Sequence, residues 1–283
     1  MRQTNASKED RDLSDFSGTL VLVGAGKMGS ALLEGWLRLG LAGRNVAVIE
    51  PAPSAALSAV TTSGLVLNPD LRTLREPAVI VLAIKPQAAA EAIAPLRAMV
   101  GATTLVISIM AGRTLQFLSG ALDGAGAVVR AMPNTPAAIG RGITVAVPLR
   151  ASGAQRQLAE RLLSATGAVE WIEDEALMDA VTAVSGSGPA YVFLLAEALA
   201  QAGIAAGLPK ALAQKLARET VAGSGELLHR SELDAAVLRA NVTSPGGTTA
   251  AALEVLMSEN GLNGLMESAV AAATARSRKL AGG

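Results

Sequence analysis

The chain has 283 residues, of which 51% are hydrophobic and only 2% aromatic, and its formal net charge at pH 7 is zero. This length suits one large domain or two ordinary ones, with a core built from Ala, Val, Leu and Ile. Zero net charge gives no general attraction to nucleic acid or to an anionic membrane. The absence of cysteine excludes disulfides, thiolate metal sites and a cysteine nucleophile.

The N-terminal segment 1–17 is polar and mixed in charge, without the apolar core of a signal peptide. We therefore predict a disordered leader over these residues. No apolar run approaches the roughly 20 residues that span a bilayer. The sequence thus predicts a cytoplasmic protein with no membrane partner and no nucleic-acid partner.

From Gly18 to about Ile172, short apolar runs alternate with helical stretches, and spacings of roughly 20–30 residues leave room for crossover helices. This alternation predicts an α/β dinucleotide-binding domain over 18–172, with a Rossmann-type, doubly wound parallel sheet. The expected strands are Leu20–Val23, Val46–Ile49, Val79–Ile84, Thr104–Ser108, Ala127–Arg130, Ile143–Val147 and Val169–Ile172. Flanking Gly142 and Pro148 predict that the run 143–147 is a short strand, at an edge of the sheet.

A G-x-G-x-x-G pattern, formed by Gly24, Gly26 and Gly29, directly follows the first expected strand and precedes a helix over Ser30–Gly40. The first glycine permits a tight turn, the second admits a pyrophosphate, and the third lets helix and strand pack closely. The alternative is an ordinary glycine-rich turn. The intervening positions of the predicted cofactor loop are Ala25, Lys27 and Met28.

The second expected strand ends at Glu50, where a carboxylate accepts hydrogen bonds from the adenosine ribose diol. It would repel a 2′-phosphate, and no arginine lies in the next ten residues to compensate. The residue favours NAD over NADP, although a solvated glutamate at a strand end is the plain alternative.

Two further strand ends are predicted to line the cofactor, because ligands of open parallel sheets bind outside the carboxyl ends of the strands. For Lys85 the alternative is a solvated loop lysine. The first loop contains Ala83, Ile84, Lys85 and Pro86, and the second contains Ile109, Met110 and Ala111.

Asn134 lies in a turn that two prolines make rigid, at another strand end, where its side chain could reach substrate or cofactor. A structural Asx-type turn explains the residue equally well.

After Trp171 the strand pattern stops, and Ala, Leu, Glu and Arg recur at helical spacing. This predicts a helical substrate and dimerisation domain over 173–283. The expected helices are Glu175–Val184, Pro189–Gln201, Pro209–Leu228, Ser231–Arg239, Thr248–Ser258 and Gly261–Leu280. Several of them are apolar on more than one face, which predicts burial against a second copy of the chain. Asp179–Tyr191 is interpreted as a break between two helices.

His229 is the only histidine, at a polar helix end, so histidine metal sites and Ser-His catalysis are not expected. A hydroxy-acid dehydrogenase usually needs His or Lys to move the alcohol proton. A protonated imine instead accepts hydride without a strong acid. The segment Asn241–Thr249 brings hydroxyls and glycines to a helix start, where free N–H groups suit a small anion such as a carboxylate.

Together the motifs Arg130–Pro136, Asp179–Tyr191 and Val242–Thr249 resemble those of the pyrroline-5-carboxylate reductase family, and the resemblance runs from Thr19 to about Leu280. It implies reduction of 1-pyrroline-5-carboxylate to L-proline, the last step of proline biosynthesis, by hydride from NAD(P)H. It also implies an interlocked helical dimerisation domain, with dimers often assembled into decamers. No metal is implied.

The resemblance also implies residue roles. Thr249 would hydrogen-bond the ring nitrogen, with Ser244 and the amides of Gly247 and Thr248 around the carboxylate. Glu175 occupies the place of a substrate-side acid. Asn241 and the loops 83–86 and 109–111 match cofactor-lining positions.

The chain departs from the family pattern at three places. Ala240 replaces a common Asp, and Ser231–Asp234 replaces a Gly-Glu-His-Pro turn. Glu50 replaces the neutral or basic residues of NADP-preferring members, which favours NADH here.

Two other functions remain open on the sequence. One is reduction of another cyclic imine or a keto acid on the same scaffold. The other is a non-catalytic nucleotide sensor, which fold alone does not exclude.

Overall fold

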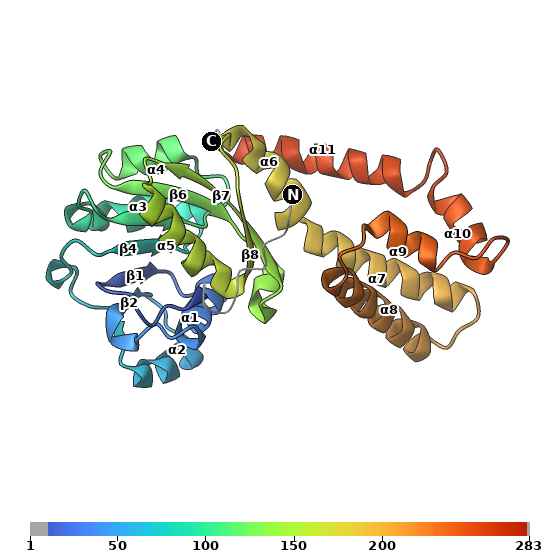
Figure 1. The fold of residues 1–283 in the computed structure, drawn as a ribbon, viewed down its shortest axis with the longest axis horizontal. Helices are drawn as coiled ribbons and strands as arrows, with labels where there is room; N and C mark the ends of the chain where they lie inside the picture. The colour runs from blue at the N-terminus through green and yellow to red at the C-terminus, as the bar shows by residue number, and fades with distance from the viewer. Residues whose placement is uncertain (1–10, 282–283) are drawn as a thin grey trace. The chain divides into compact units, whose positions relative to one another are not determined.

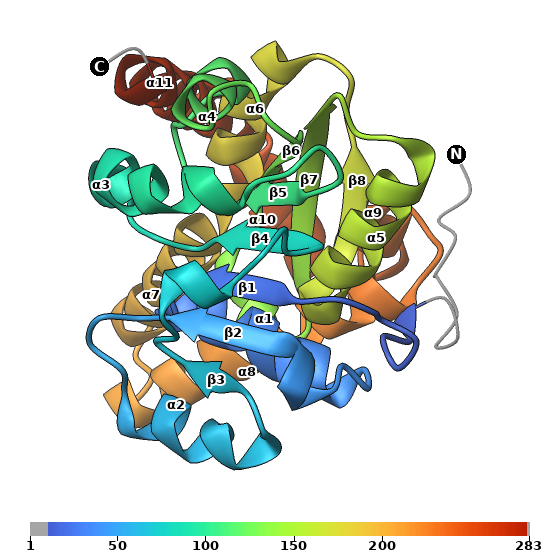
Figure 2. The ribbon, with the colours of Figure 1, turned by 90° about the vertical axis from the view of Figure 1, so that its left-hand side faces the viewer.

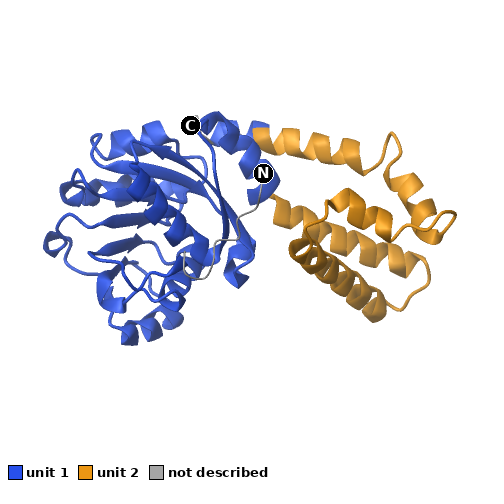
Figure 3. Cartoon of the chain, viewed as in Figure 1, with its two compact units in different colours: residues 1–186, 275–283 blue, residues 187–274 orange. Residues whose placement is uncertain are grey.

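The computed structural model describes residues 11–281. They form two compact units (Figure 3). Unit 1 comprises the chain up to residue 186 together with the residues from 275 onward, and unit 2 comprises residues 187–274.

In the described part of unit 1, eight strands form one sheet in the order β3-β2-β1-β4-β5-β6-β7-β8, which can be followed in Figure 2. Neighbouring strands are parallel except β6 and β7, which are antiparallel. The strands are β1 (Leu20–Val23), β2 (Val46–Ile49), β3 (Val66–Leu67), β4 (Val79–Leu82), β5 (Leu105–Ser108), β6 (Ala127–Met132), β7 (Gly142–Leu149) and β8 (Gly167–Trp171).

The predicted Rossmann-type sheet is confirmed, with three differences in its strands, of which the first is that β6 and β7 pair antiparallel in a sheet that was predicted to be parallel. Strand β3 was missed, because two residues are too short to carry an alternating pattern. Strand β7 was wrongly predicted to be a short edge strand. It is eight residues long and lies between β6 and β8, so Gly142 and Pro148 fall within it rather than bounding it.

Helices cover both faces of the sheet (Figure 1). One face packs against α1 (Lys27–Arg38), α2 (Ala55–Val60) and α5 (Gly153–Leu163). The other packs against α3 (Ala89–Ile93), α4 (Leu115–Ala121) and α6 (Met178–Val181). Strands β1, β2, β4, β5, β6 and β7 contribute side chains to both cores, because successive side chains point to opposite faces of the sheet.

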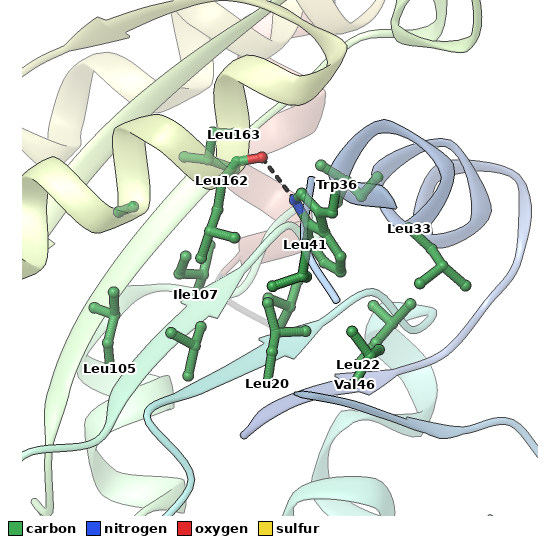
Figure 4. Packing of buried hydrophobic residues seen from close by; sticks show 14 of the residues in the cluster. Leu20, Leu22, Leu33, Trp36, Leu41, Val46, Leu105, Ile107, Leu162 and Leu163 are labelled. Atoms are coloured by element: carbon green, nitrogen blue, oxygen red, sulfur yellow. Dashed lines mark hydrogen bonds between the residues drawn. The ribbon is translucent and has the colours of Figure 1, made fainter. Parts of the chain in front are cut away.

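The core beneath α1 and α5 is apolar except for one anchored ring (Figure 4). Trp36 on α1 is 1% exposed, and its indole N–H donates to the carbonyl of Leu162 on α5 at 2.8 Å. This hydrogen bond satisfies the only polar atom of a large buried ring and fixes the two helices against each other.

The N-terminal segment differs from its prediction where the structure describes it. Residues 1–10 lie outside the described residues, but residues 11–17 belong to the fold. Leu13 is 1% exposed and Phe16 is 9% exposed, both in the core beneath α1, and the Leu13 amide donates to the Leu39 carbonyl at 2.8 Å. Two apolar side chains of this polar segment are therefore buried, and Arg161 on α5 also pairs with Asp15.

Unit 2 is helical, as predicted. It contains α7 (Gly188–Ala205), α8 (Lys210–Arg230), α9 (Ala235–Asn241), α10 (Thr248–Leu256) and most of α11 (Leu262–Ala281). Its buried hydrophobic residues are Ala200, Ala213 and Ala217, whereas Phe193 and Leu194 are 68% and 61% exposed. The apolar surface of these helices is therefore left uncovered within one chain.

The segment before α7 was predicted to contain a break between two helices, and the regular α-helix is interrupted there. A π-helical turn, Thr182–Gly186, follows α6, and a bend at Ser187 precedes the start of α7. The resulting helical stretch, Glu175–Ala205, is long and apolar enough to cross a membrane by length and composition alone. The separate helices expected over 175–184 and 189–201 are each too short to span a bilayer. A single stretch of this kind is weak evidence for a membrane span, since an apolar helix that packs on a partner chain has the same composition.

The boundary between the two compact units lies at 186/187, later in the chain than the predicted domain boundary at 172/173. Met178 is fully buried in the core of unit 1. Ser277, near the end of α11, donates its hydroxyl to Asp179 at 2.6 Å. These contacts attach residues 173–186 and the last turns of α11 to unit 1.

Candidate functional site

The turn after β1 depends on two glycines that have no room for a side chain. Gly24 has φ +90°, and a Cβ there would lie 2.6 Å from the carbonyl oxygen of Ala83. A Cβ on Gly29 would lie 2.2 Å from the carbonyl oxygen of Gly24. These are the tight-turn and close-packing roles predicted from the pattern.

Gly26 has the opposite environment, because no protein atom lies within 4 Å of the position a Cβ would take. Gly26 and Lys27 are exposed, and no side chain caps the N-terminus of α1. The first backbone N–H groups of a 12-residue helix are thus open to solvent. This cradle fits a diphosphate group, which needs close backbone approach and N–H donors.

Glu50, directly after β2, turns its carboxylate to the glycine loop. Oε2 accepts from the Ala25 amide at 2.8 Å, and Oε1 accepts from the Ala52 amide at 3.0 Å. The structure therefore brings together the cofactor loop and the acidic residue predicted to select the ribose.

The loop after β4 also reaches this corner of unit 1. The Ala83 amide donates to the carbonyl of Val23 at 2.8 Å, and Ile84 packs beside Gly24. Lys85 is exposed at the N-terminus of a 3₁₀ turn that Pro86 begins. Arg113 donates from Nη2 to the Pro86 carbonyl at 2.8 Å and so ties this loop to the segment before α4.

The loop after β5 contributes less than was predicted. Ile109 and Ala111 are accessible, and the Ile109 amide donates to the carbonyl of Leu82 at 3.0 Å. Met110 is 2% exposed and packs in the core beneath α3 and α4. Its side chain is therefore not on the surface, and only its backbone can face a ligand.

Asn134 has a structural role, although not the Asx-type turn considered from the sequence. Its Oδ1 accepts from the amide of Ile143 at 3.0 Å and so joins the turn after β6 to the start of β7. Half of the side-chain amide is thus already used within the protein.

Glu175 pairs with a buried arginine. The guanidinium of Arg130 on β6 is 6% exposed and donates from Nη1 to Glu175 Oε1 at 2.7 Å. The same oxygen accepts from the amide of Leu115, the first residue of α4, at 2.8 Å. Glu175 therefore neutralises Arg130 and holds the N-terminus of α4, within unit 1.

The start of α10, in unit 2, keeps the donors that the sequence predicted, with one exception. No side chain caps this helix, whose N-cap is Gly247. The Gly247 amide is already bound to the Ser244 carbonyl at 3.0 Å, so it is not free to bind an anion. Within residues 11–281, no hydrogen bond engages the hydroxyls of Ser244, Thr248 or Thr249.

A hollow of about 500 Å³ lies along α10 and is lined by Gly246, Gly247, Ala250, Ala251, Leu253, Glu254 and Met257, but not by Ser244, Thr248 or Thr249. Ser244 and Thr248 are exposed and Thr249 is half-buried, so a small ligand can reach this helix start. Asn241, the last residue of α9, is exposed in the same unit, whereas the other predicted cofactor residues belong to unit 1.

Three residues were not found from the sequence. Asn68 holds the backbone of Glu50, Arg113 holds the loop after β4, and Arg130 binds Glu175. Arg130 lies within one of the motifs already singled out, and its place in a buried apolar strand was the available signal. Nothing in the sequence indicated a role for Asn68 or Arg113.

Comparison with known proteins covers nearly the whole chain. Residues 175–280 match a family model described as pyrroline-5-carboxylate reductase dimerisation, and residues 19–112 match one described as NADP oxidoreductase, coenzyme F420-dependent. A pyrroline-5-carboxylate reductase from Pseudomonas aeruginosa is 38% identical over 264 residues, which is 93% of this chain and 96% of that protein.

Solved structures show the same similarity. A pyrroline-5-carboxylate reductase from Coxiella burnetii superposes with a TM-score of 0.87 at 33% identity, covering 94% of this chain and 99% of that one. The pyrroline carboxylate reductase of Plasmodium falciparum, solved with NADP bound, gives a TM-score of 0.78 at 29% identity, over 94% and 98% of the two chains.

Substitutions at Gly26 and Gly29 test dinucleotide binding and folding separately, because only Gly29 lacks room for a side chain. We expect Gly26→Ala to fold with a melting temperature near that of the wild type but to bind dinucleotide at least about tenfold more weakly, because its methyl group fills the cradle. Gly29→Ala should instead lose stability through its clash with Gly24. Thermal unfolding and calorimetric titration distinguish the two. Unchanged dinucleotide affinity in Gly26→Ala would place the ligand elsewhere.

Glu175 can be tested by removing either its charge alone or the whole carboxyl group. Glu175→Ala leaves Arg130 buried without a partner and should cost about 3 kcal/mol of unfolding free energy. Glu175→Gln keeps an oxygen acceptor and should cost less, with kcat within about twofold of the wild type. Urea unfolding and initial rates check both. A stable Glu175→Gln protein with a large loss of kcat would give the carboxylate a direct role in the reaction.

Proposed function

The chain belongs to the pyrroline-5-carboxylate reductase family, and from this premise we propose how its residues carry out the NAD(P)H-dependent reduction of 1-pyrroline-5-carboxylate to L-proline. The observation that carries the assignment of residues is the uncapped start of α10, with its three unengaged hydroxyls. A cyclic imine that bears a carboxylate requires an anion site beside a group that orients nitrogen.

Residues at the start of α10 bind the substrate in this proposal. The amides of Thr248 and Thr249 belong to the first helical turn and have no acceptor within the helix, so they donate to the substrate carboxylate together with the Ser244 hydroxyl. Gly247 contributes backbone space rather than its amide, which is bound to Ser244. The Thr249 hydroxyl orients the ring nitrogen.

Catalysis then rests on positioning. The protonated imine is already electrophilic, so no strong acid is needed, and the electron pair of the C=N bond moves to nitrogen and leaves a secondary amine. Hydroxyl and amide donors that fix the ring in one orientation lower the barrier through preorganisation. Glu175 is proposed as a positioning residue, because its carboxylate is already bound to Arg130 and Leu115.

The dinucleotide fits residues of unit 1, as judged from the open cradle at Gly26 and the uncapped start of α1. Gly24–Gly29 would hold the pyrophosphate, and the loops 83–86 and 109–111 would lie along the rest of the dinucleotide. Asn134 and Asn241 are further proposed contacts. Bound there, the reduced nicotinamide supplies the hydride for the C=N carbon.

We propose that NADH is preferred, because of how Glu50 is held. Each carboxylate oxygen already accepts one backbone N–H, from Ala25 or from Ala52, which leaves further lone pairs for two hydroxyl donors. A ribose diol has two such hydroxyls. A 2′-phosphate has no hydroxyl at that position and adds negative charge beside a carboxylate.

A basic residue that could bind a 2′-phosphate lies a short distance along the chain. Arg72 donates from Nη2 to Asp70 at 2.7 Å, and its hydrogen bonds hold the pKa of the Asp70 carboxyl below its ordinary value. Asp70 therefore competes with a 2′-phosphate for the guanidinium of Arg72. The Plasmodium falciparum relative, by contrast, was solved with NADP, so the preference must be measured for this chain.

Self-association is supported by the match of residues 175–280 to a dimerisation model and by the uncovered apolar helices of unit 2. We propose a dimer, with dimers assembled further into a decamer, in the cytoplasm. Light scattering in solution tests this against the chain mass of 28.5 kDa. A monomeric mass would contradict the proposal.

The Thr249 hydroxyl is tested by its removal. Thr249→Ala should lower kcat by about 100-fold, because an unoriented imine seldom presents its carbon to the hydride, while the affinity for NADH stays unchanged. Thr249→Ser, which keeps the hydroxyl, is the matched control and should retain most of the activity. Initial rates and cofactor titrations check both. Unchanged turnover in Thr249→Ala would remove this residue from the mechanism.

Cofactor preference is tested by initial rates with NADH and NADPH side by side, at saturating 1-pyrroline-5-carboxylate. We expect a higher kcat/KM with NADH. Glu50→Gln should lower the ratio of kcat/KM with NADH to kcat/KM with NADPH by about tenfold, because it removes the negative charge but keeps the size of the side chain. Higher kcat/KM with NADPH in the wild type would contradict the proposed preference.

A further inference from the structure

Strand β3 stops before its neighbour does. Its two residues pair with Ala47 and Val48 of β2. After Leu67 the backbone turns away, and Asn68 adopts a left-handed conformation with φ 49°. Ile49, the last residue of β2, and Glu50 directly after it therefore have no strand on that side.

The side chain of Asn68 takes the place of the missing strand. Its Oδ1 accepts from the amide of Glu50 at 2.8 Å, and its Nδ2 donates to the carbonyl of Glu50 at 2.9 Å. The amide of Asn68 donates to the carbonyl of Val48 at 2.7 Å. A carboxamide presents one acceptor and one donor side by side, as a peptide group does, so it can continue the ladder by one residue.

Asn is well suited to this position for two separate reasons. It is one of the few residues that tolerate the left-handed region. It also carries the carboxamide that the end of β2 requires. Glycine would satisfy only the first requirement and glutamine only the second.

These hydrogen bonds determine where the Glu50 carboxylate lies. With both backbone polar groups of Glu50 held by one side chain, the residue has little freedom in φ and ψ. The carboxylate then reaches Ala25 on one side and Ala52 on the other. Without the Asn68 carboxamide, Glu50 would end an unsupported strand, and its carboxylate would be free to turn to solvent.

We infer that Asn68 is the positioning residue for dinucleotide selection: its carboxamide holds the backbone of Glu50 so that the carboxylate meets the adenosine ribose diol. This inference rests on the proposed function, and specifically on the site at Gly24–Gly29 and Glu50. It adds a specificity-determining residue that makes no contact with the ribose itself in this arrangement.

The test uses Asn68→Gly, which keeps the left-handed backbone and removes only the carboxamide. Asn45→Ala is the matched control, because Asn45 also donates its side-chain amide to a backbone carbonyl, that of Phe16 at 3.0 Å, at the opposite end of β2. Full-length proteins are titrated with NADH and with NADPH by calorimetry, without substrate. Initial rates and thermal unfolding are measured alongside.

We expect Asn68→Gly to weaken NADH binding by about tenfold and NADPH binding by less than about twofold, with kcat at saturating NADH unchanged. Asn45→Ala should alter neither affinity. If Asn68→Gly does not fold, Asn68→Ser replaces it, since serine removes the carboxamide without adding a charge, and it too should weaken NADH binding selectively.

An Asn68 variant with a lowered melting temperature but unchanged affinity for NADH would overturn the inference and leave Asn68 a structural residue. Equal weakening of NADH and NADPH would overturn it as well. The wild-type ratio of the two affinities separately tests the proposed NADH preference. If the wild type binds NADPH more tightly, that preference is wrong, and the change in NADH affinity in Asn68→Gly still decides the role of Asn68.

Discussion

The close approach of backbone to backbone at the turn after β1 is the constraint on which the rest of unit 1 depends. Gly24 lies against the carbonyl of Ala83, and Gly29 lies against the carbonyl of Gly24. Any side chain at either position would push α1 away from the sheet. Because the turn is this tight, the carboxyl ends of β1, β2 and β4 converge, and the Ala25 amide comes within hydrogen-bond distance of Glu50.

The two units satisfy their apolar residues in different ways. Unit 1 buries both faces of its sheet beneath helices, and two of its buried polar groups are paired: the Trp36 indole with the Leu162 carbonyl, and the Arg130 guanidinium with Glu175. The buried hydrophobic residues of unit 2 are small alanines, whereas Phe193 and Leu194 are exposed. The exposed apolar surface of this unit agrees with the match of residues 175–280 to a dimerisation model.

Local pattern predicted most of the strands, the helices and the glycine loop, because each depends on residues a few positions apart. The errors have physical causes. Strand β3 is too short to show a period, and β7 is long because antiparallel pairing with β6 tolerates Pro148 near its end. Leu13 is buried although its neighbours are polar. Met110 and the Gly247 amide looked available for binding, but packing and a turn hydrogen bond already occupy them.

The sequence by itself determined the fold class, the family, the cofactor loop and the helix start at Thr248, since spacing along the chain encodes turns, strands and helix ends. Only the tertiary structure decided which groups pair. Glu50 meets Ala25 across 25 positions and Asn68 across 18, and Glu175 meets Arg130 across 45. Such pairs depend on strand order and register. The spacing of apolar residues along a strand or helix, every two or 3.6 residues, predicts neither of them.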